Sequence, residues 1–213
     1  MLQHSFRLTA TDIDRAFEAG HFFAVFQPKT DVLTGKMVGV ETFVRWRHPT
    51  FGLMPPGLFL GFVEAQGRMR ELTELILTLA VRAARDLRAA GKNWDVSINL
   101  GASDLADPRL PQILKTLCGM QNVPANSVIV EVPEYALPDK GSPAEANLFT
   151  IKALGCRIAL DTGPTPAAAP RPVPNGLFSE IKIGGSASIR FAHSIRQTGA
   201  TSQLTQKLRA MRD

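Results

Sequence analysis

The sequence predicts an α/β fold, a barrel of parallel strands wrapped by helices, on the basis of three observations. Short apolar runs alternate along the chain with helical or loop-like stretches. Four of these runs end in an oxygen-bearing side chain, at Glu41, Asn99, Glu131 and Asp161. The chain has 213 residues, 45% of them hydrophobic, which is enough for one sizeable core. Because the C-terminal ends of barrel strands meet on one face, we expect these four side chains to lie close together.

Hydrophobic periodicity and turn residues predict the elements that precede the first long helix. In chain order, they are a helix over residues 11–19, a strand over 22–27 that stops at Pro28, a turn at 34–36, a strand over 37–46, a Gly/Pro loop over 50–57 and a helix over 58–64. The clearest element is the next one, a helix over residues 70–90. Acidic residues begin this helix, basic residues follow, and Gly91 ends it, which suits the helix dipole. Its expected apolar stripe is Leu72, Leu75, Ile76, Leu79, Ala83 and Leu87.

The second half of the chain continues the alternation of strands and helices. The expected elements are a strand leading to Asn99, a helix over 109–120, a strand over 128–132, a helix over 145–154 and strands over 157–161 and 180–183. Five prolines fall within residues 164–174, so an extended or mobile loop is expected over 162–174. The last 30 residues suit one or two helices.

The expected strands number six, whereas a closed barrel of this kind has eight strands and about 250 residues. We therefore expect the barrel to be incomplete or open at its C-terminal end, unless the tail or a partner closes it. The expected domains are a barrel over residues 1–183 and a basic helical tail over residues 184–213. An uncovered sheet edge invites pairing with another chain, so a homo-oligomer is expected.

Composition narrows the class of protein. No apolar stretch is long enough to span a membrane, and the N-terminus lacks the apolar core of a secretory signal. Cys118 and Cys156 are too few for a disulfide framework or a zinc site, so we expect a reduced, cytoplasmic protein. The net charge is +5, and the tail holds five basic residues against Asp213 alone. A solvated helix face or attraction to an acidic partner explains this excess, and the lack of an aromatic ladder argues against nucleic acid.

Seven short motifs, in order, resemble those of the EAL domain, a bacterial family that hydrolyses the second messenger cyclic di-GMP. The resemblance runs from about Leu8 to Ile183 and implies a TIM-like (β/α) barrel. Each motif alone is weak, but the order and spacing of all seven are specific. The motifs are Phe26-Gln27-Pro28, Glu41-Thr42-Phe43-Val44-Arg45-Trp46, Phe59 to Glu64, Ser97-Ile98-Asn99-Leu100, Glu131-Val132-Pro133-Glu134, Asp161-Thr162 and Ile181-Lys182-Ile183-Gly184.

The resemblance implies a role for seven residues. The residues that match the ligands of the first metal, Mg²⁺ or Mn²⁺, are Glu41, Asn99, Glu131 and Asp161. Lys182 matches a lysine that helps to position the attacking water, and Gln27 and Arg45 match contacts to guanine and phosphate. Hydrolysis of a phosphodiester in such sites uses two cations, which activate water and neutralise developing charge.

Departures from the family pattern point to a degenerate site. Thr162 stands where the family has an aspartate that bridges the two metals, and a neutral hydroxyl replaces a carboxylate poorly. A proline-alanine stretch replaces the Phe-Gly-Thr-Gly loop, and Gly184 replaces the aspartate after Lys182. A later Ala-Glu-Gly-Val-Glu motif with a catalytic glutamate and a final Gln-Gly-Tyr segment have no counterpart here.

These observations leave three functions open. The first expectation is a catalytically inactive module that acts through a protein partner. The second is a receptor that binds cyclic di-GMP without cleaving it, and the third is a weak metal-dependent phosphodiesterase. Purely structural interpretations also stay open. In these, the strand-end acids are solvated loop residues, Lys182 forms a salt bridge with one of them, and Arg45 forms a structural ion pair.

Overall fold

The computed structural model describes residues 7–31, 34–163 and 176–182, and it divides into two compact units. The first unit contains residues 1–98 and 117–123, and the second contains residues 99–116 and 124–213. We describe each unit by itself.

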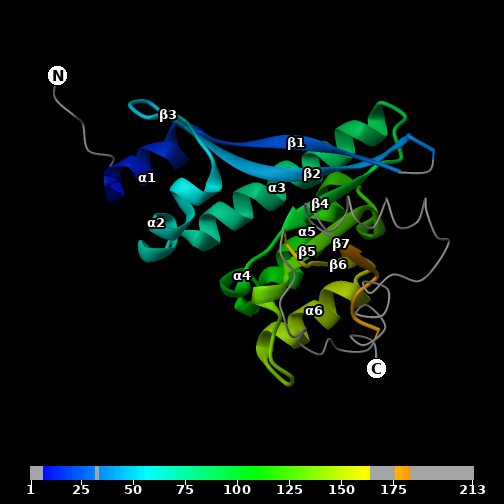
Figure 1. The fold of residues 1–213 in the computed structure, drawn as a ribbon. Helices are drawn as coiled ribbons and strands as arrows, with labels where there is room; N and C mark the ends of the chain where they lie inside the picture. The colour runs from blue at the N-terminus through cyan, green and yellow to red at the C-terminus, as the bar shows by residue number, and fades with distance from the viewer. Residues whose placement is uncertain (1–6, 32–33, 164–175, 183–213) are drawn as a thin grey trace, which may run out of the picture. The chain divides into compact units, whose positions relative to one another are not determined.

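The first unit contains a mixed sheet built around one long strand. β1 (Phe22–Thr30) pairs antiparallel with β2 (Met37–His48), and β2 pairs antiparallel with the short β3 (Gly52–Met54) (Figure 1). β4 (Asp95–Asn99) pairs with β2 in parallel. Gly39 permits the close approach of β2 and β4, because a Cβ at this position would lie 2.7 Å from the carbonyl oxygen of Asp95.

Helices cover the apolar face of this sheet. They are α1 (Ala10–Glu18), the 3₁₀ turn η1 (Pro56–Leu58), α2 (Leu60–Ala65) and α3 (Met69–Ala89). The core that they enclose is centred on Trp46, Phe22 and Phe59. Trp46 is fully buried, and its ring centroid lies 4.8 Å from that of Phe22 and 5.6 Å from that of Phe59.

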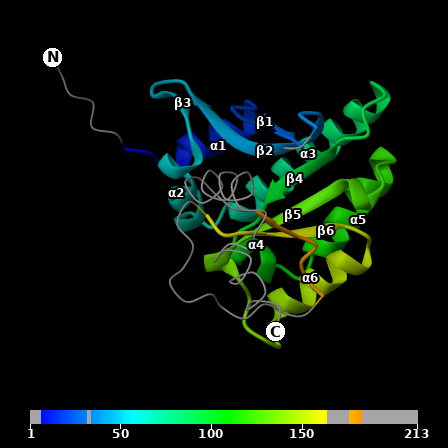
Figure 2. The ribbon, with the colours of Figure 1, turned by 45° about the vertical axis from the view of Figure 1, so that its right-hand side comes forward.

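The second unit contains three parallel strands: β5 (Val128–Pro133), β6 (Arg157–Asp161) and β7 (Glu180–Lys182). Its helical elements are α4 (Ala102–Ala106), the 3₁₀ turns η2 (Ala125–Ser127) and η3 (Glu134–Ala136), and α6 (Pro143–Ala153). α5 (Leu110–Gln121) begins in this unit. α6 packs along β6 (Figure 2), and its residue Lys152 donates a 3.0 Å hydrogen bond to the carbonyl of Leu177 just before β7.

The predicted alternation of strands and helices is confirmed, with element ends shifted by a few residues. The expectation of parallel strands holds for β2 with β4 and for β5 to β7, whereas β1 and β3 pair antiparallel with β2. One error is Pro28, which lies inside β1 opposite Val40 rather than ending the strand. Proline lacks an N–H donor and is tolerated in strands at sheet edges, and among the described residues β1 pairs with β2 alone. The sequence prediction also missed β3 within the expected Gly/Pro loop and the five-residue helix α4.

The apolar stripe expected on α3 is partly wrong. The buried residues of this helix are Leu72, Leu77, Ala80, Val81 and Ala84, whereas the other predicted stripe residues are half-buried. α3 packs against β1 and β2 and against α2, so it buries a wider and rotated face. Most of the expected proline-rich loop and the whole expected tail lie outside the described residues.

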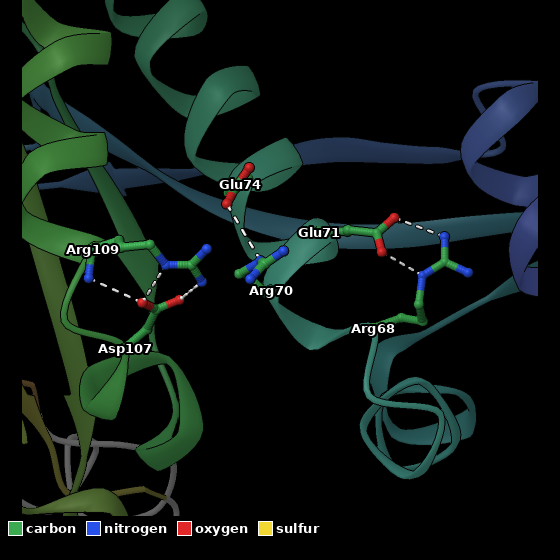
Figure 3. Close-up of polar contacts among 6 residues, drawn as sticks. All are labelled: Arg68, Arg70, Glu71, Glu74, Asp107 and Arg109. Carbon is green, nitrogen blue, oxygen red and sulfur yellow. Dashed lines mark hydrogen bonds and ion pairs between the residues drawn. The ribbon is translucent and has the colours of Figure 1, made fainter.

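Surface ion pairs mark the start of α3. Nε and Nη2 of Arg68 donate to the two carboxylate oxygens of Glu71 at 2.5 and 2.7 Å, and Arg70 lies 3.8 Å from Glu74 (Figure 3). The hydrogen bonds from Arg68 hold the pKa of Glu71 below its ordinary range and raise the pKa of Arg68. These side chains are largely exposed, and such pairs contribute little to stability.

Candidate functional site

Three of the predicted site residues meet in the second unit at the C-terminal ends of its strands. Nζ of Lys182 donates a 2.8 Å hydrogen bond to Oε2 of Glu131, and it lies 3.5 Å from Oδ2 of Asp161. The Glu131 side chain is fully buried, whereas Lys182 is 33% and Asp161 22% exposed. One ammonium group therefore contacts two carboxylates from two other strands.

Strand register explains why these side chains meet. Asp161 of β6 stands opposite Lys182 of β7 and opposite Pro133 of β5. Glu131 lies two residues before Pro133, and side chains two apart on a strand point to the same face. Glu131, Asp161 and Lys182 therefore share one face of the three-stranded sheet.

Asn99 is the fourth predicted site residue in this unit. The residue that follows it, Leu100, contacts the backbone of Glu131. The N–H of Leu100 donates a 3.0 Å hydrogen bond to the carbonyl oxygen of Glu131. Asn99 itself is exposed at the end of β4. Asn99 therefore directly precedes the residue that is hydrogen-bonded to the backbone of Glu131.

Thr162, the residue after Asp161, is held by hydrogen bonds to the backbone of β7. The N–H and the hydroxyl of Thr162 both donate to the carbonyl oxygen of Lys182, each at 3.1 Å. The next residue also engages the cluster, because the N–H of Gly163 donates a 2.8 Å hydrogen bond to Oδ1 of Asp161. Thr162 is buried and fastens β7 to β6 at the position where the sequence resemblance leads us to expect a second carboxylate.

A second ion pair lies on the same face of this sheet, which the sequence analysis did not identify. Nη1 of Arg157 donates a 3.0 Å hydrogen bond to Oε1 of Glu180. Arg157 lies two positions from Ala159, which stands between Glu131 and Glu180 in the register. The sequence signal for this pair is that each of the two short strands carries one basic and one acidic residue. They are Arg157 and Asp161 on β6, and Lys182 and Glu180 on β7.

The other predicted residues lie in the first unit. Gln27 of β1 stands directly opposite Glu41 of β2, and Glu41 stands opposite Ser97 of β4. Glu41 is buried and Gln27 is exposed. Arg45, four residues after Glu41 on the same strand, donates a 2.8 Å hydrogen bond to the carbonyl of Val44 and lies with its guanidinium carbon 5.7 Å from the centre of the Phe43 ring.

Lys29 adds a cation to this face, and the sequence analysis did not single it out. Its Nζ donates a 2.9 Å hydrogen bond to the hydroxyl of Ser97. Lys29 is two residues from Gln27, and Ser97 stands opposite Glu41, so the four side chains belong to one face of the sheet. The sequence signal for Lys29 is its place two residues after Gln27 on the same strand. Only the β1–β2 register shows that this places Lys29 on the face that carries Glu41.

The described residues do not assemble a carboxylate-rich metal centre. Within the described ranges, no group of three or more His, Cys, Asp or Glu side chains is placed to hold a metal ion. In the second unit, the ammonium of Lys182 lies against the carboxylate oxygens of Glu131 and Asp161. A metal ion at this position would use the same oxygens. A metal site of Glu41, Asn99, Glu131 and Asp161 therefore stays a prediction, as do the roles of Lys182, Gln27 and Arg45.

Comparison with known proteins defines the class. The chain matches the EAL domain over residues 10–212 and belongs to this family. An uncharacterised protein of Mycobacterium tuberculosis is 30% identical over 201 residues, which are 93% of this chain and 66% of that relative. The cyclic di-GMP phosphodiesterase RocR of Pseudomonas aeruginosa is 28% identical over 153 residues, covering 72% of this chain and 39% of RocR. The chain thus spans under two thirds of these relatives.

Solved structures agree on the fold. A PaMucR phosphodiesterase in complex with c-di-GMP superposes with a TM-score of 0.72 at 25% identity, covering 89% of this chain and 75% of that one. The FimX EAL domain from Pseudomonas aeruginosa, bound to c-di-GMP, gives a TM-score of 0.68 at 17% identity, covering 95% and 81%. The expected TIM-like barrel fold of the EAL type is thus confirmed. No helix within the described ranges is both long and apolar enough to cross a membrane.

Proposed function

We propose that this chain is a degenerate EAL-domain signalling module of the cyclic di-GMP system, which acts in the cytoplasm by contacting a protein partner and does not hydrolyse the nucleotide efficiently. The observation that carries this proposal is the residue that follows Asp161, which is a threonine and not a second acid. Thr162 is neutral there, and its hydroxyl donates to the carbonyl of Lys182.

The chemistry of phosphodiester hydrolysis supports a loss of activity. A two-cation site needs carboxylates that bridge the ions, activate water and neutralise the charge of the transition state. A neutral threonine hydroxyl supplies no negative charge to bridge two cations, and its proton is donated to the carbonyl oxygen of Lys182. The ammonium of Lys182 is also held by Glu131, so it is not poised on a water molecule.

A protein partner is supported by the replaced loop and by exposed apolar side chains. The Phe-Gly-Thr-Gly loop of the family is replaced by a proline-alanine stretch after Gly163. Tyr135, which is 83% exposed, follows β5 on a turn whose next residues, Ala136 and Leu137, are buried. Aromatic side chains presented in this way are enriched in protein interfaces. A second copy of the chain is one partner that would use them.

A receptor for cyclic di-GMP is the second candidate function. The face of the first unit that carries Gln27, Glu41 and Arg45 keeps the residue types that the family uses near the nucleotide. Two of the similar structures are described as complexes with c-di-GMP. Binding needs fewer groups than hydrolysis, so it survives the change at Thr162 more readily.

Titration calorimetry of the full chain with cyclic di-GMP, in the presence of Ca²⁺ to suppress turnover, tests both functions. The proposal expects no heat of binding, a result that a fluorescent-nucleotide assay repeats. Binding at micromolar or tighter affinity that Arg45→Ala weakens at least tenfold would favour the receptor. Thr50→Ala, on the loop after β2, is the matched control and leaves any binding unchanged.

Turnover of cyclic di-GMP with Mn²⁺ tests the loss of activity. We expect no hydrolysis above the background measured without protein. Hydrolysis that falls when Glu131 is replaced by Gln would contradict the proposal.

Light scattering tests whether the partner is a second copy of the chain. A dimer or larger species would identify a second copy as one partner, whereas a monomer would direct the search to another protein.

A further inference from the structure

We propose that Lys182 is the resident cation of the Glu131 and Asp161 carboxylates, so that the protein neutralises this cluster itself and divalent cations bind it weakly. The proposal concerns the chain without nucleotide. It therefore stands or falls separately from the proposed function.

Burial makes an internal cation necessary. The Glu131 side chain is 0% exposed, and a buried carboxylate is strongly disfavoured unless a cation and hydrogen bonds compensate for its lost hydration. Lys182 supplies a charge-assisted hydrogen bond to Glu131 at 2.8 Å. The same Nζ lies 3.5 Å from Asp161, so one ammonium serves two acids.

The backbone holds this lysine in place. Lys182 stands opposite Asp161 in the parallel register of β6 and β7. Its carbonyl oxygen accepts hydrogen bonds from both the N–H and the hydroxyl of Thr162. Strand pairing therefore places the backbone of Lys182 beside Asp161, and the ammonium is held by its contacts with the two carboxylates. Movement of the ammonium away from them would leave Glu131 buried without this partner.

A divalent cation would compete with this ammonium for the same oxygens. Mg²⁺ and Mn²⁺ need several oxygen ligands in a regular geometry, and a fixed positive charge nearby opposes their entry. One of the remaining oxygens, Oδ1 of Asp161, already accepts the N–H of Gly163. Thr162, which replaces a carboxylate, cannot offset the charge of the lysine.

Thermal unfolding of the full chain, with and without Mn²⁺, tests the proposal through Lys182→Met. Methionine keeps the unbranched shape of the lysine stem, is one atom shorter and removes the charge. The variant should unfold about 6–12 °C lower than the wild type in a chelating buffer, because a buried carboxylate loses its cation. Mn²⁺ should restore most of this loss in the variant and leave the wild-type midpoint unchanged.

Two further variants separate the proposal from general effects of charge. Arg157→Met breaks the other ion pair on the same face, but Glu180 is 35% exposed and stands alone, so Mn²⁺ should not rescue this variant. Lys182→Arg keeps the cation and should respond to Mn²⁺ as little as the wild type.

The proposal is overturned if Mn²⁺ raises the wild-type midpoint as much as that of Lys182→Met, or if it leaves the folded Lys182→Met variant unchanged. Should Lys182→Met not fold, calorimetry of the wild type with Mn²⁺ alone decides the question. No binding supports the proposal, whereas binding that Asp161→Asn abolishes contradicts it.

Discussion

Two buried clusters of this chain, one in each unit, differ in the kind of side chain that they contain. The first unit buries an aromatic cluster in which Trp46 contacts Phe22 and Phe59. The second unit buries the carboxylate of Glu131, which a lysine on a neighbouring strand neutralises. Apolar packing gains stability from removing surface from water, whereas a buried ion pair must first offset the loss of hydration of two charges.

The charged cluster of the second unit is a better candidate for a functional role than the aromatic cluster of the first. The cluster around Trp46 is closed by helices and suits stability alone. Buried ion pairs add little stability relative to an apolar replacement, so the charges of the second unit are the better candidates for a functional role. Substitutions in the two units should therefore differ in size and in their response to ions and pH.

Replacement of Trp46 by alanine should produce the largest loss of stability. Removal of a fully buried aromatic side chain leaves a cavity, and the expected loss is about 3–5 kcal/mol in the free energy of unfolding. Urea unfolding followed by circular dichroism measures it. The loss should not depend on Mn²⁺, because the indole side chain carries no charge and binds no metal.

Trp46→Phe is the matched control for this experiment. Among the described residues, Nε1 of Trp46 is buried and has no hydrogen-bond partner, so the loss of this N–H costs little. Phenylalanine keeps an aromatic ring beside Phe22 and Phe59. Equal losses from the two variants would contradict the idea that ring packing at Trp46 dominates the stability of the first unit.

Much of the fold could be predicted because each strand is a short apolar run followed by a turn residue. The errors arise where three-dimensional neighbours decide the outcome. Pro28 continues β1 because that strand pairs on one side among the described residues, and a sequence pattern does not reveal edges. β3 has three residues, which is too short to show a period of two. The buried face of α3 depends on the strands it covers.

The candidate site divides in the same way. Strand ends predicted that Glu131, Asp161 and Lys182 would approach one another, because parallel register brings such ends together. The pairing of Lys182 with a strand-end acid was one of the interpretations left open by the sequence, and the structure shows it. The partners of Arg157 and Lys29 were not predictable, since they depend on which strands are neighbours. The pairing of Arg157 with Glu180 and the contact of Lys29 with Ser97 both join residues far apart in the sequence.

Thr162→Val tests the second unit with an effect of intermediate size. Valine keeps the shape of threonine but removes the hydroxyl that donates to the carbonyl of Lys182, and the expected loss is about 1 kcal/mol. Thr162→Ser retains the hydroxyl and should lose less. If Val and Ser variants unfold at the same urea concentration, the hydroxyl does not fasten β7 to β6.

Asp12→Asn should give the smallest effect and the clearest dependence on pH. Asp12 lies in the first turn of α1, where the hydroxyl and N–H of Thr9 donate to Oδ2 at 2.6 and 2.9 Å. The side-chain hydrogen bond from Thr9 is the main cause that lowers the pKa of Asp12, and the nearby His48 adds to it. Asparagine keeps an acceptor oxygen but loses the negative charge that favours a helix N-terminus, an effect of about 0.3–1 kcal/mol.

The sign of this pH dependence follows from the lowered pKa. A carboxyl group whose pKa is lower in the folded chain than in the unfolded chain stabilises the fold above the unfolded value, about 3.9 for aspartate, and loses this contribution as pH falls through the folded value. The wild type should therefore exceed Asp12→Asn in stability at pH 6, and the two curves should converge as the pH falls through the folded value. Urea midpoints measured across this range test the prediction. A constant difference would mean that Asp12 acts through shape rather than charge, and the first unit would then owe its stability to packing throughout.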